Sequence, residues 1–336
     1  MKRSCRMLWA DRRELPAMLR IIDRSGIAAR QIALPVDRVI RERTFAQKNA
    51  EYAECAIPLA ERAARAALDR AHLAPDQIDL LVTTSCTGIM IPSLSSFLMP
   101  RLGMRSDCVR LPITELGCAA GAAAIARANE YCLAHPGRIA MVLACELPSL
   151  TFQRQDMSMT NFIAAAIFGD GAACAIVGGP PVASSPDVVS SRSHLFPDSH
   201  RLMGFDVGEG GFHIVLASDV PEFLQGKVRP LVQKLCDENG VALESLAFAA
   251  IHPGGRRILE NLESDLKLAP EVTAHSWEVL NQHGNMSSAT VLFVLDRLLR
   301  SPHRHTIPEG AHGLLAAFGP GFSAEISLLR WHKGHR

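Results

Sequence analysis

The sequence predicts an α/β protein built around mostly buried sheets. Strand-like apolar runs alternate along the chain with alanine- and leucine-rich stretches of helical period. The 336 residues are 48% hydrophobic and 21% charged, an ordinary globular composition with enough apolar material for a sizeable core. A loop-rich stretch, GGPPVASSPD at residues 178–187, divides the chain into two parts of comparable size. We therefore expect two halves, residues 1–185 and 186–336.

Four apolar runs are the predicted buried strands, at residues 78–83 (IDLLVT), 139–144 (IAMVLA), 246–251 (LAFAAI) and 313–317 (GLLAA). Their continuous apolar character is typical of strands that are covered on both faces. Helical periodicity is clearest over residues 56–71 and 289–300. This alternation of buried strands with helices predicts the α/β class.

Composition excludes several classes of protein. No apolar run approaches the ~18–20 residues of a membrane span, and the N-terminus, MKRSCRMLWADRRELP, lacks the continuous apolar stretch of a secretory signal. Nine cysteines are scattered without regular spacing, which argues for a reducing compartment rather than a disulfide framework. We therefore expect a cytoplasmic protein without a membrane span.

Positive charge is concentrated at the start of the chain. The net charge is only +1, but residues 1–48 hold 12 Lys and Arg against 5 Asp and Glu. Two interpretations stay open, a solvated basic face and a mouth that attracts an anionic substrate carrier. A nucleic-acid partner is not expected, because the excess is local and aromatic residues make up only 5%.

A candidate nucleophile lies in ITELGCAAGAAAIARANEYC, residues 113–132. Gly117 and Gly121 flank Cys118, and a run of small residues then begins an amphipathic helix. At a helix N-terminus the dipole and the free N–H groups favour a thiolate. Small neighbours allow a sharp turn and close approach of a substrate. The alternative is a buried, inert cysteine.

Two further polar residues follow predicted strands or precede helices. His252 comes at the end of the strand in LAFAAIHPGGRRILE, just before a glycine-rich turn, which is a favourable place for a site residue. Asn285 precedes a strongly periodic helix in QHGNMSSATVLFVLDRLL. A structural histidine and a helix-capping asparagine are the alternatives.

Cysteine, histidine and asparagine together form a recurring catalytic set of thiolate, imidazole and amide. Thioester condensation and amide hydrolysis could both use them. In this chain the order Cys118, His252, Asn285, with each residue at a glycine-rich junction of strand and helix, resembles the thiolase-like condensing enzymes.

Several motifs resemble those of the type III polyketide synthases, the chalcone-synthase-like family. They are LGCAAG around Cys118, FGDGAA at 168–173, GFHIVLASDVP at 211–221, HPGG at 252–255, GNMSSA at 284–289 and AFGPG at 317–321. Ketoacyl synthase III enzymes usually carry His-Gln-Ala-Asn where this chain has HPGG. The segments SCTGIMIPSL at 85–94 and LTFQRQD at 150–156 look most like those of bacterial alkylpyrone and alkylresorcinol synthases.

The resemblance implies a thiolase-like fold of two duplicated αβαβα halves in five layers, a homodimer, and coenzyme A thioesters as substrates without a cofactor or a metal. Residue by residue, it implies that Cys118, His252 and Asn285 are catalytic. The two gatekeeper phenylalanines of the family's active-site cavity correspond to Phe168 and Phe212. Plain core packing is the alternative for both rings.

The resemblance also implies which residues bind coenzyme A, the carrier of the acyl group. Arg20 and Arg24 match two basic positions that bind the coenzyme A phosphates, while Ala17 replaces a third, and Gly254 is placed beside the carrier. The family's usual first strand, ahead of this basic helix, is not found, so the chain is truncated or the strand is replaced.

Three residues are assigned to the substrate cavity by the same comparison. Cys86 stands where many plant enzymes have a cavity-lining threonine, Ile91 where plant members have a methionine that reaches into the partner subunit, and Thr151 lines the cavity. These residues and the stretch NFIAAAIF at 161–168 are small or aliphatic. A cavity for a planar aromatic starter more often carries stacking partners. We therefore predict a medium- or long-chain fatty acyl starter and a pyrone or resorcinol product.

The expected mechanism begins with transfer of an acyl group from coenzyme A to Cys118, kept ionised by a pair with His252 and by the helix dipole. His252 and Asn285 then donate hydrogen bonds to the malonyl thioester oxygen and stabilise the enolate that forms as carbon dioxide leaves. The enolate attacks the acyl group on Cys118.

Three other functions compete with this one. The first is a ketoacyl-ACP synthase III-like enzyme that performs a single condensation. The second is a Cys-His-Asn hydrolase, which would need neither the two arginines nor a closed apolar site. The third is a metal-binding protein using His303 and His305, but PHRH has no Cys-x-x-Cys partner, so no metal is expected.

Overall fold

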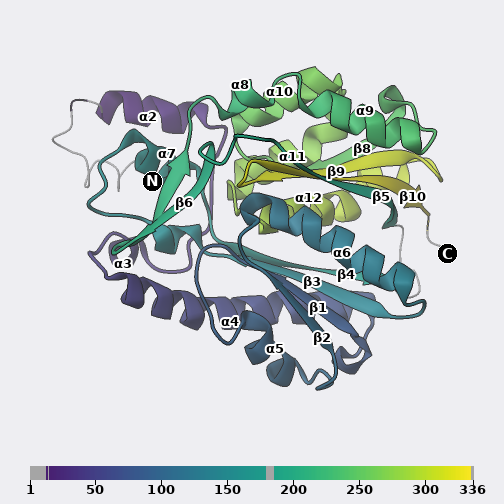
Figure 1. The fold of residues 1–336 in the computed structure, drawn as a ribbon, viewed down its shortest axis with the longest axis horizontal. Helices are drawn as coiled ribbons and strands as arrows, with labels where there is room; N and C mark the ends of the chain where they lie inside the picture. Colours follow the sequence, from purple (N-terminus) through teal and green to yellow (C-terminus); the bar gives the residue numbers. More distant parts are fainter. Residues whose placement is uncertain (1–12, 14, 179–184, 334–336) are drawn as a thin grey trace.

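The computed structural model describes residue 13 and residues 15–178 and 185–333. In these residues the helices and strands form five alternating layers (Figure 1). Residues 179–184, the centre of the predicted boundary between the halves, lie outside the described part, as does most of the basic segment before residue 15. The predicted α/β class is confirmed.

The first sheet has the strand order β2-β1-β3-β4. Its strands are β1 (Leu80–Thr84), β2 (Val109–Ile113), β3 (Ile139–Glu146) and β4 (Gly171–Gly178). Strand β1 is parallel to both β2 and β3, whereas β4 is antiparallel to β3. β1 and β3 are buried along their whole length, as their continuous apolar sequences predicted.

The second sheet has the strand order β5-β10-β9-β8. Its strands are β5 (Ser185–Leu195), β8 (Phe248–Ile251), β9 (His312–Gly319) and β10 (Ser323–His332). Only β8 and β9 are parallel, and β10 runs antiparallel to both of its neighbours. The strands expected over residues 246–251 and 313–317 are therefore confirmed.

Two helices lie between the sheets, α6 (Ala120–Ala134) and α12 (Ala289–Arg300) (Figure 1). Alanine dominates the buried first half of α6, so this helix fits closely between its neighbours. At Gly121 a Cβ atom would lie 2.2 Å from the carbonyl oxygen of Ser288. Glycine is therefore required where the beginnings of the two helices meet, and this contact brings Cys118 towards Asn285.

Outer helices cover the other faces of the two sheets (Figure 1). The first sheet is covered by α4 (Phe45–Ala71) and α5 (Leu94–Leu102). The second sheet is covered by helices of the C-terminal part: α8 (Val220–Leu224), α9 (Val228–Glu238), α10 (Arg256–Leu266) and α11 (Pro270–His283). Helix α11 also contacts α12. No helix in the described residues is long and apolar enough to cross a membrane.

A small group of elements lies at one end of the layers (Figure 1). It consists of α2 (Leu15–Arg24), α3 (Val36–Val39), α7 (Met159–Ile167) and the antiparallel hairpin of β6 (Met203–Gly208) and β7 (Gly211–Leu216). Met18 and Ile22 of α2 pack against Phe162 and Ala166 of α7 in a separate apolar cluster. These elements, which we call the cap, face the carboxyl ends of β1 and β3.

Candidate active site

A cavity of about 970 Å³ lies between the cap and the sheet ends. Its walls come from the loops after β1 and β3, the segment before α6, α7 and the β6–β7 hairpin. Of the residues predicted from the sequence, six line it: Cys86, Ile91, Cys118, Thr151, Phe168 and Phe212. The cavity therefore joins the predicted nucleophile to the predicted substrate residues.

Cys118 lies in the short 3-10 helix η2 (Gly117–Ala119), immediately before α6. The preceding Gly117 has a φ of +50°, and a Cβ there would come within 2.6 Å of the Pro320 ring. Glycine thus permits the tight turn that delivers the thiol to the cavity. The predicted position of Cys118 at the start of a helix is confirmed.

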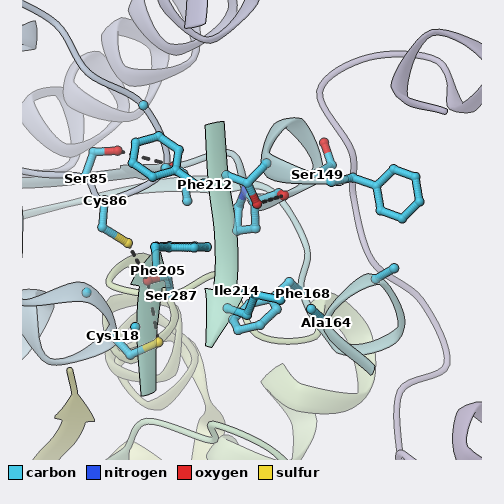
Figure 2. Close-up of a pocket in the computed structure, with 18 of the residues that line it drawn as sticks. Ser85, Cys86, Cys118, Ser149, Ala164, Phe168, Phe205, Phe212, Ile214 and Ser287 are labelled. Atoms are coloured by element: carbon cyan, nitrogen blue, oxygen red, sulfur yellow. Dashed lines mark hydrogen bonds between the residues drawn. The ribbon is translucent and has the colours of Figure 1, made fainter. Parts of the chain in front are cut away.

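The Cys118 thiol is 6% exposed and is held by two neighbours. Its Sγ lies 3.5 Å from Ser287 Oγ and 3.9 Å from Asn285 Oδ1. Figure 2 shows Cys118 and Cys86 both directed towards Ser287. Burial raises the pKa of the Cys118 thiol to about 11, although its hydrogen bonds with Ser287 and Asn285 act in the opposite direction.

Asn285 is fixed by its backbone and its side chain. It pairs with Phe168 in an isolated bridge, donating its N–H to Ile167 O at 2.9 Å and accepting from Gly169 N at 2.9 Å. Its Nδ2 donates to Gly254 O at 3.1 Å. The N-cap of α12 is Ser288, so the interpretation of Asn285 as the cap of that helix is wrong.

His252 directly follows β8, as predicted, and is 2% exposed. Its backbone N–H bonds Ala316 O at 2.8 Å, but among the described residues neither ring nitrogen has a hydrogen-bond partner. Buried polar atoms without a partner are uncommon, so these two nitrogens are candidates for contact with a substrate. Burial lowers the pKa of the imidazole to about 4, so the ring is neutral at physiological pH.

The predicted ion pair between Cys118 and His252 is not formed in this structure. The thiol bonds Ser287 and Asn285, while the imidazole nitrogens bond none of the described groups. Burial favours the neutral form of both side chains, which opposes the effect of the helix dipole on which the sequence-based expectation relied.

Aromatic side chains form part of the cavity wall, which we call the aromatic wall. Phe168 directly follows α7 and Phe212 lies on β7, and both line the cavity (Figure 2). The ring of Phe212 lies 5.4 Å from that of Phe205 on β6 and 5.4 Å from that of Phe45 on α4. Phe205, which sequence reasoning missed, thus belongs to the same wall.

Glu146 is a second residue that sequence reasoning missed. It ends β3, is fully buried, and accepts hydrogen bonds from Cys86 N at 3.0 Å, Thr87 Oγ1 at 2.8 Å and Ser288 Oγ at 2.6 Å. Burial raises the pKa of this carboxyl group, which those bonds partly counteract. A charged residue that ends an otherwise apolar strand, IAMVLACE, was the available signal.

Of the remaining predicted residues, two line the cavity and three do not. Thr151 lines the cavity and donates its hydroxyl to Pro148 O at 2.9 Å, and Ile91 lines the mouth with 93% of its surface exposed. Arg20 and Arg24 are exposed on α2 and do not line the cavity. Gly254 contributes the carbonyl that holds Asn285.

Comparison with known proteins decides the family. Residues 35–181 match the N-terminal domain of the chalcone and stilbene synthases, and residues 187–332 match their C-terminal domain. The chain belongs to this family. A 1,3,6,8-tetrahydroxynaphthalene synthase of Streptomyces peucetius is 39% identical, the match covering 94% of this chain and 84% of the relative. An alpha-pyrone synthesis polyketide synthase of Mycobacterium tuberculosis is 29% identical over 96% of this chain and 84% of its own length.

The crystal structure of a 1,3,6,8-tetrahydroxynaphthalene synthase from Streptomyces coelicolor, a bacterial type III polyketide synthase, superposes with a TM-score of 0.94. It is 35% identical, and the match covers 99% of this chain and 94% of that one. This member of the chalcone and stilbene synthase family is accordingly a type III polyketide synthase, an acyl-transferring condensing enzyme with the predicted thiolase-like fold.

The pKa of Cys118 leads to a prediction for its reactivity. Because the folded-state pKa of the thiol is raised to about 11, the thiolate fraction should keep increasing with pH through the neutral range. Alkylation by iodoacetamide, followed by mass spectrometry of the Cys118 peptide, should accelerate about tenfold per pH unit from pH 6 to 9. A plateau reached by pH 7 would instead reveal the ion pair with His252.

Proposed function

We propose that Cys118, His252 and Asn285 catalyse the decarboxylative condensation of malonyl-CoA with an acyl group carried on Cys118. The observation that carries the proposal is a chain of contacts that starts at the cavity. The buried Cys118 thiol lines the cavity and contacts the fixed amide of Asn285. The imidazole of His252, without hydrogen-bond partners among the described residues, lies on the other side of Gly254, where Nε2 is 3.7 Å from the place of a Cβ atom. The thiol and the other two groups come from the two proposed halves, residues 1–185 and 186–336.

Loading requires a proton acceptor and a nucleophile. Cys118 would transfer its proton to the neutral imidazole of His252 and attack the thioester carbonyl of an acyl-CoA. Coenzyme A would then leave as the thiol, taking that proton back from His252. The product of this step is an acyl thioester on Cys118 and a neutral imidazole, as before.

Extension uses the same imidazole as a donor. A neutral imidazole carries one N–H, and Asn285 Nδ2 has a second hydrogen beyond the one it gives to Gly254 O. Both can point at the thioester oxygen of malonyl-CoA. Negative charge would collect on that oxygen as carbon dioxide leaves, and the resulting enolate carbon would attack the acyl carbonyl and expel the Cys118 thiolate.

Coenzyme A, the carrier of the acyl group, is proposed to bind over α2. Arg20 and Arg24 are one helical turn apart and exposed, and neither takes part in an ion pair of the described residues. Such free guanidinium groups suit the phosphates of coenzyme A, with Gly254 beside the thioester arm. The double substitution Arg20→Ala, Arg24→Ala should raise KM for malonyl-CoA and leave kcat unchanged; an unchanged KM would contradict this assignment.

A homodimer is proposed from the surface around the cavity mouth. Strand β2 lies at the edge of its sheet with Val109 and Leu111 exposed, and Phe97 is exposed on the neighbouring α5. Ile91, at the mouth, exposes nearly its whole side chain. A second copy would cover such an apolar edge. Sedimentation velocity should give twice the chain mass, and a monomer would contradict the proposal.

For the starter we propose a medium- or long-chain fatty acyl group. Part of the cavity wall is formed by aliphatic side chains before and within α3: Ile27, Ile32, Val36 and Val39. Each buried methylene stabilises a bound chain by ~0.8 kcal/mol, so specific polar contacts are not required. The relative named for alpha-pyrone synthesis supports a pyrone product.

A second candidate is a short starter that gives a hydroxylated aromatic product. It is favoured by the more similar relatives, because 1,3,6,8-tetrahydroxynaphthalene carries no alkyl chain. The aromatic wall of Phe168, Phe205 and Phe212 is compatible with a folded chain that becomes aromatic.

One experiment separates these candidates. The enzyme is given malonyl-CoA with starters from acetyl-CoA to palmitoyl-CoA, and products are identified by mass spectrometry. We expect the highest kcat/KM for long starters. The substitution Cys86→Phe fills the cavity beside the thiol, so it should lower kcat/KM for long starters about tenfold and leave kcat/KM for short starters unchanged. Cys86→Ala is the control, since it removes the thiol without adding volume. A wild-type preference for malonyl-CoA alone would instead establish the second candidate.

A further inference from the structure

A buried cation lies behind the aromatic wall and has no part in the proposed chemistry. Lys48, in the first turns of α4, is only 7% exposed. Its Nζ donates to Gln153 Oε1 at 2.7 Å and to Gly210 O at 3.0 Å. Burial, and then the nearby Arg43, lower the pKa of this amine to about 8. Burial of an ammonium group is costly unless it is hydrogen-bonded, so its partners define its role.

Gln153 extends the connection to the cavity wall. It is 6% exposed, and its Nε2 donates to the backbone carbonyl of Phe212 at 2.8 Å. Lys48 thus holds the β6–β7 hairpin twice, directly at its turn through Gly210 and indirectly at Phe212 through Gln153. All three contacts join segments more than 50 residues apart in the sequence.

The hairpin depends on such contacts. Its two strands pair only with each other among the described strands, and a two-stranded ribbon is marginally stable alone. It also lies close to α4, because a Cβ at Gly211, whose φ is +104°, would come within 3.0 Å of the Phe45 ring. Phe205, Phe212 and Ile214 of this hairpin line the cavity (Figure 2).

We propose that Lys48 is a positioning residue of the condensing site, which through Gln153 and Gly210 fixes the hairpin and so keeps Phe212 against the growing acyl chain. The consequence for catalysis rests on the proposed function, since it assumes that the chain grows from Cys118 into this cavity. Loosening the hairpin would admit water and leave intermediates less confined, so that hydrolysis competes with extension.

The test compares Lys48→Met with wild type. Methionine keeps the length and the apolar stem of the side chain but removes its charge and its three donors. Amide hydrogen exchange over residues 203–216 should become about tenfold faster, the loss expected for charge-assisted bonds, while β1 and β3 stay protected. The ratio of fully extended to shorter products should fall several-fold, with KM for malonyl-CoA unchanged because the coenzyme A site proposed on α2 is untouched.

Lys234→Met is the matched control. Lys234 is exposed on α9, which covers the second sheet, so this variant should exchange and react like wild type. If Lys48→Met does not fold, Gln153→Met tests the same connection, because it breaks the bond to Phe212 O and leaves Lys48 its bond to Gly210.

Hydrogen exchange reports on the hairpin and the product ratio reports on the chemistry, so the two are measured separately. Wild-type exchange over residues 203–216 in Lys48→Met would overturn the proposal. So would an unchanged product ratio in that variant, if Phe212→Ala shifts the ratio. When Phe212→Ala itself shifts nothing, the proposed place of the acyl chain is wrong, and hydrogen exchange alone still decides whether Lys48 fixes the hairpin. Combining Lys48→Met with Phe212→Ala should shift the product ratio no further than Phe212→Ala alone.

Discussion

Replacing Cys118 with alanine is expected to abolish polyketide formation and to leave decarboxylation of malonyl-CoA measurable. Without the thiol no acyl group can be held for attack, so product should fall at least about 10³-fold. The groups proposed to stabilise the enolate, His252 and Asn285, are unchanged in this variant. Product is measured by mass spectrometry after incubation with malonyl-CoA and a starter, and decarboxylation by release of labelled carbon dioxide.

The control is a second cysteine substitution remote from the cavity. Cys236 is buried in α9 beneath the second sheet, and Cys236→Ala should keep full product formation with only a modest loss of stability. Product made by Cys118→Ala at a rate near that of wild type would show that no covalent intermediate forms on Cys118. Loss of decarboxylation together with product would mean that the thiol also helps to bind malonyl-CoA.

The central strands could be predicted from the sequence because burial on both faces leaves continuous aliphatic runs, as in β1, β3 and β8. β10 was missed although it is almost wholly buried. Its sequence, SAEISLLRWH, places Ser323, Glu325 and Ser327 inside, where Ser191 and Ser193 of β5 supply hydrogen bonds. Such pairing cannot be recognised from the local sequence, because its partners lie more than a hundred residues away.

At the site, too, features of the local sequence could be predicted and contacts between distant segments could not. Cys118, His252 and Asn285 could be located because each lies at a glycine-rich junction, which marks the end of a strand or the start of a helix. Glu146 and Lys48 could not be given roles, because the role of a buried charge is set by its partners, Ser288 and Gln153, which come from distant segments. The pKa of the thiol could not be predicted for a related reason, since the degree of burial that raises it is a property of the folded chain.

Replacing Asn285 with alanine should suppress decarboxylation of malonyl-CoA by about 10²–10³-fold, the usual cost of removing one donor from an oxyanion site. Acyl transfer to the enzyme should change much less, because loading needs only the Cys118 thiol and the His252 imidazole. The two steps are separated by mass spectrometry of the acylated Cys118 peptide in a single turnover and by release of labelled carbon dioxide.

Asn285 also has structural contacts, so its proposed hydrogen bond to the enolate must be distinguished from its support of the surrounding loop. Its Oδ1 accepts the backbone N–H of Ser287 at 2.8 Å and, like the Ser287 hydroxyl, it lies beside the Cys118 thiol. Ser287→Ala removes a neighbour of the thiol while leaving both proposed donors, and it should lower decarboxylation less than about tenfold. If Asn285→Ala slowed loading and decarboxylation equally, with a matching fall in Tm, the amide would support the loop rather than the enolate. Selective loss of decarboxylation with only a modest fall in Tm is the expected outcome, because the side-chain bonds to Gly254 and Ser287 are lost while the backbone bonds of Asn285 to Ile167 and Gly169 remain.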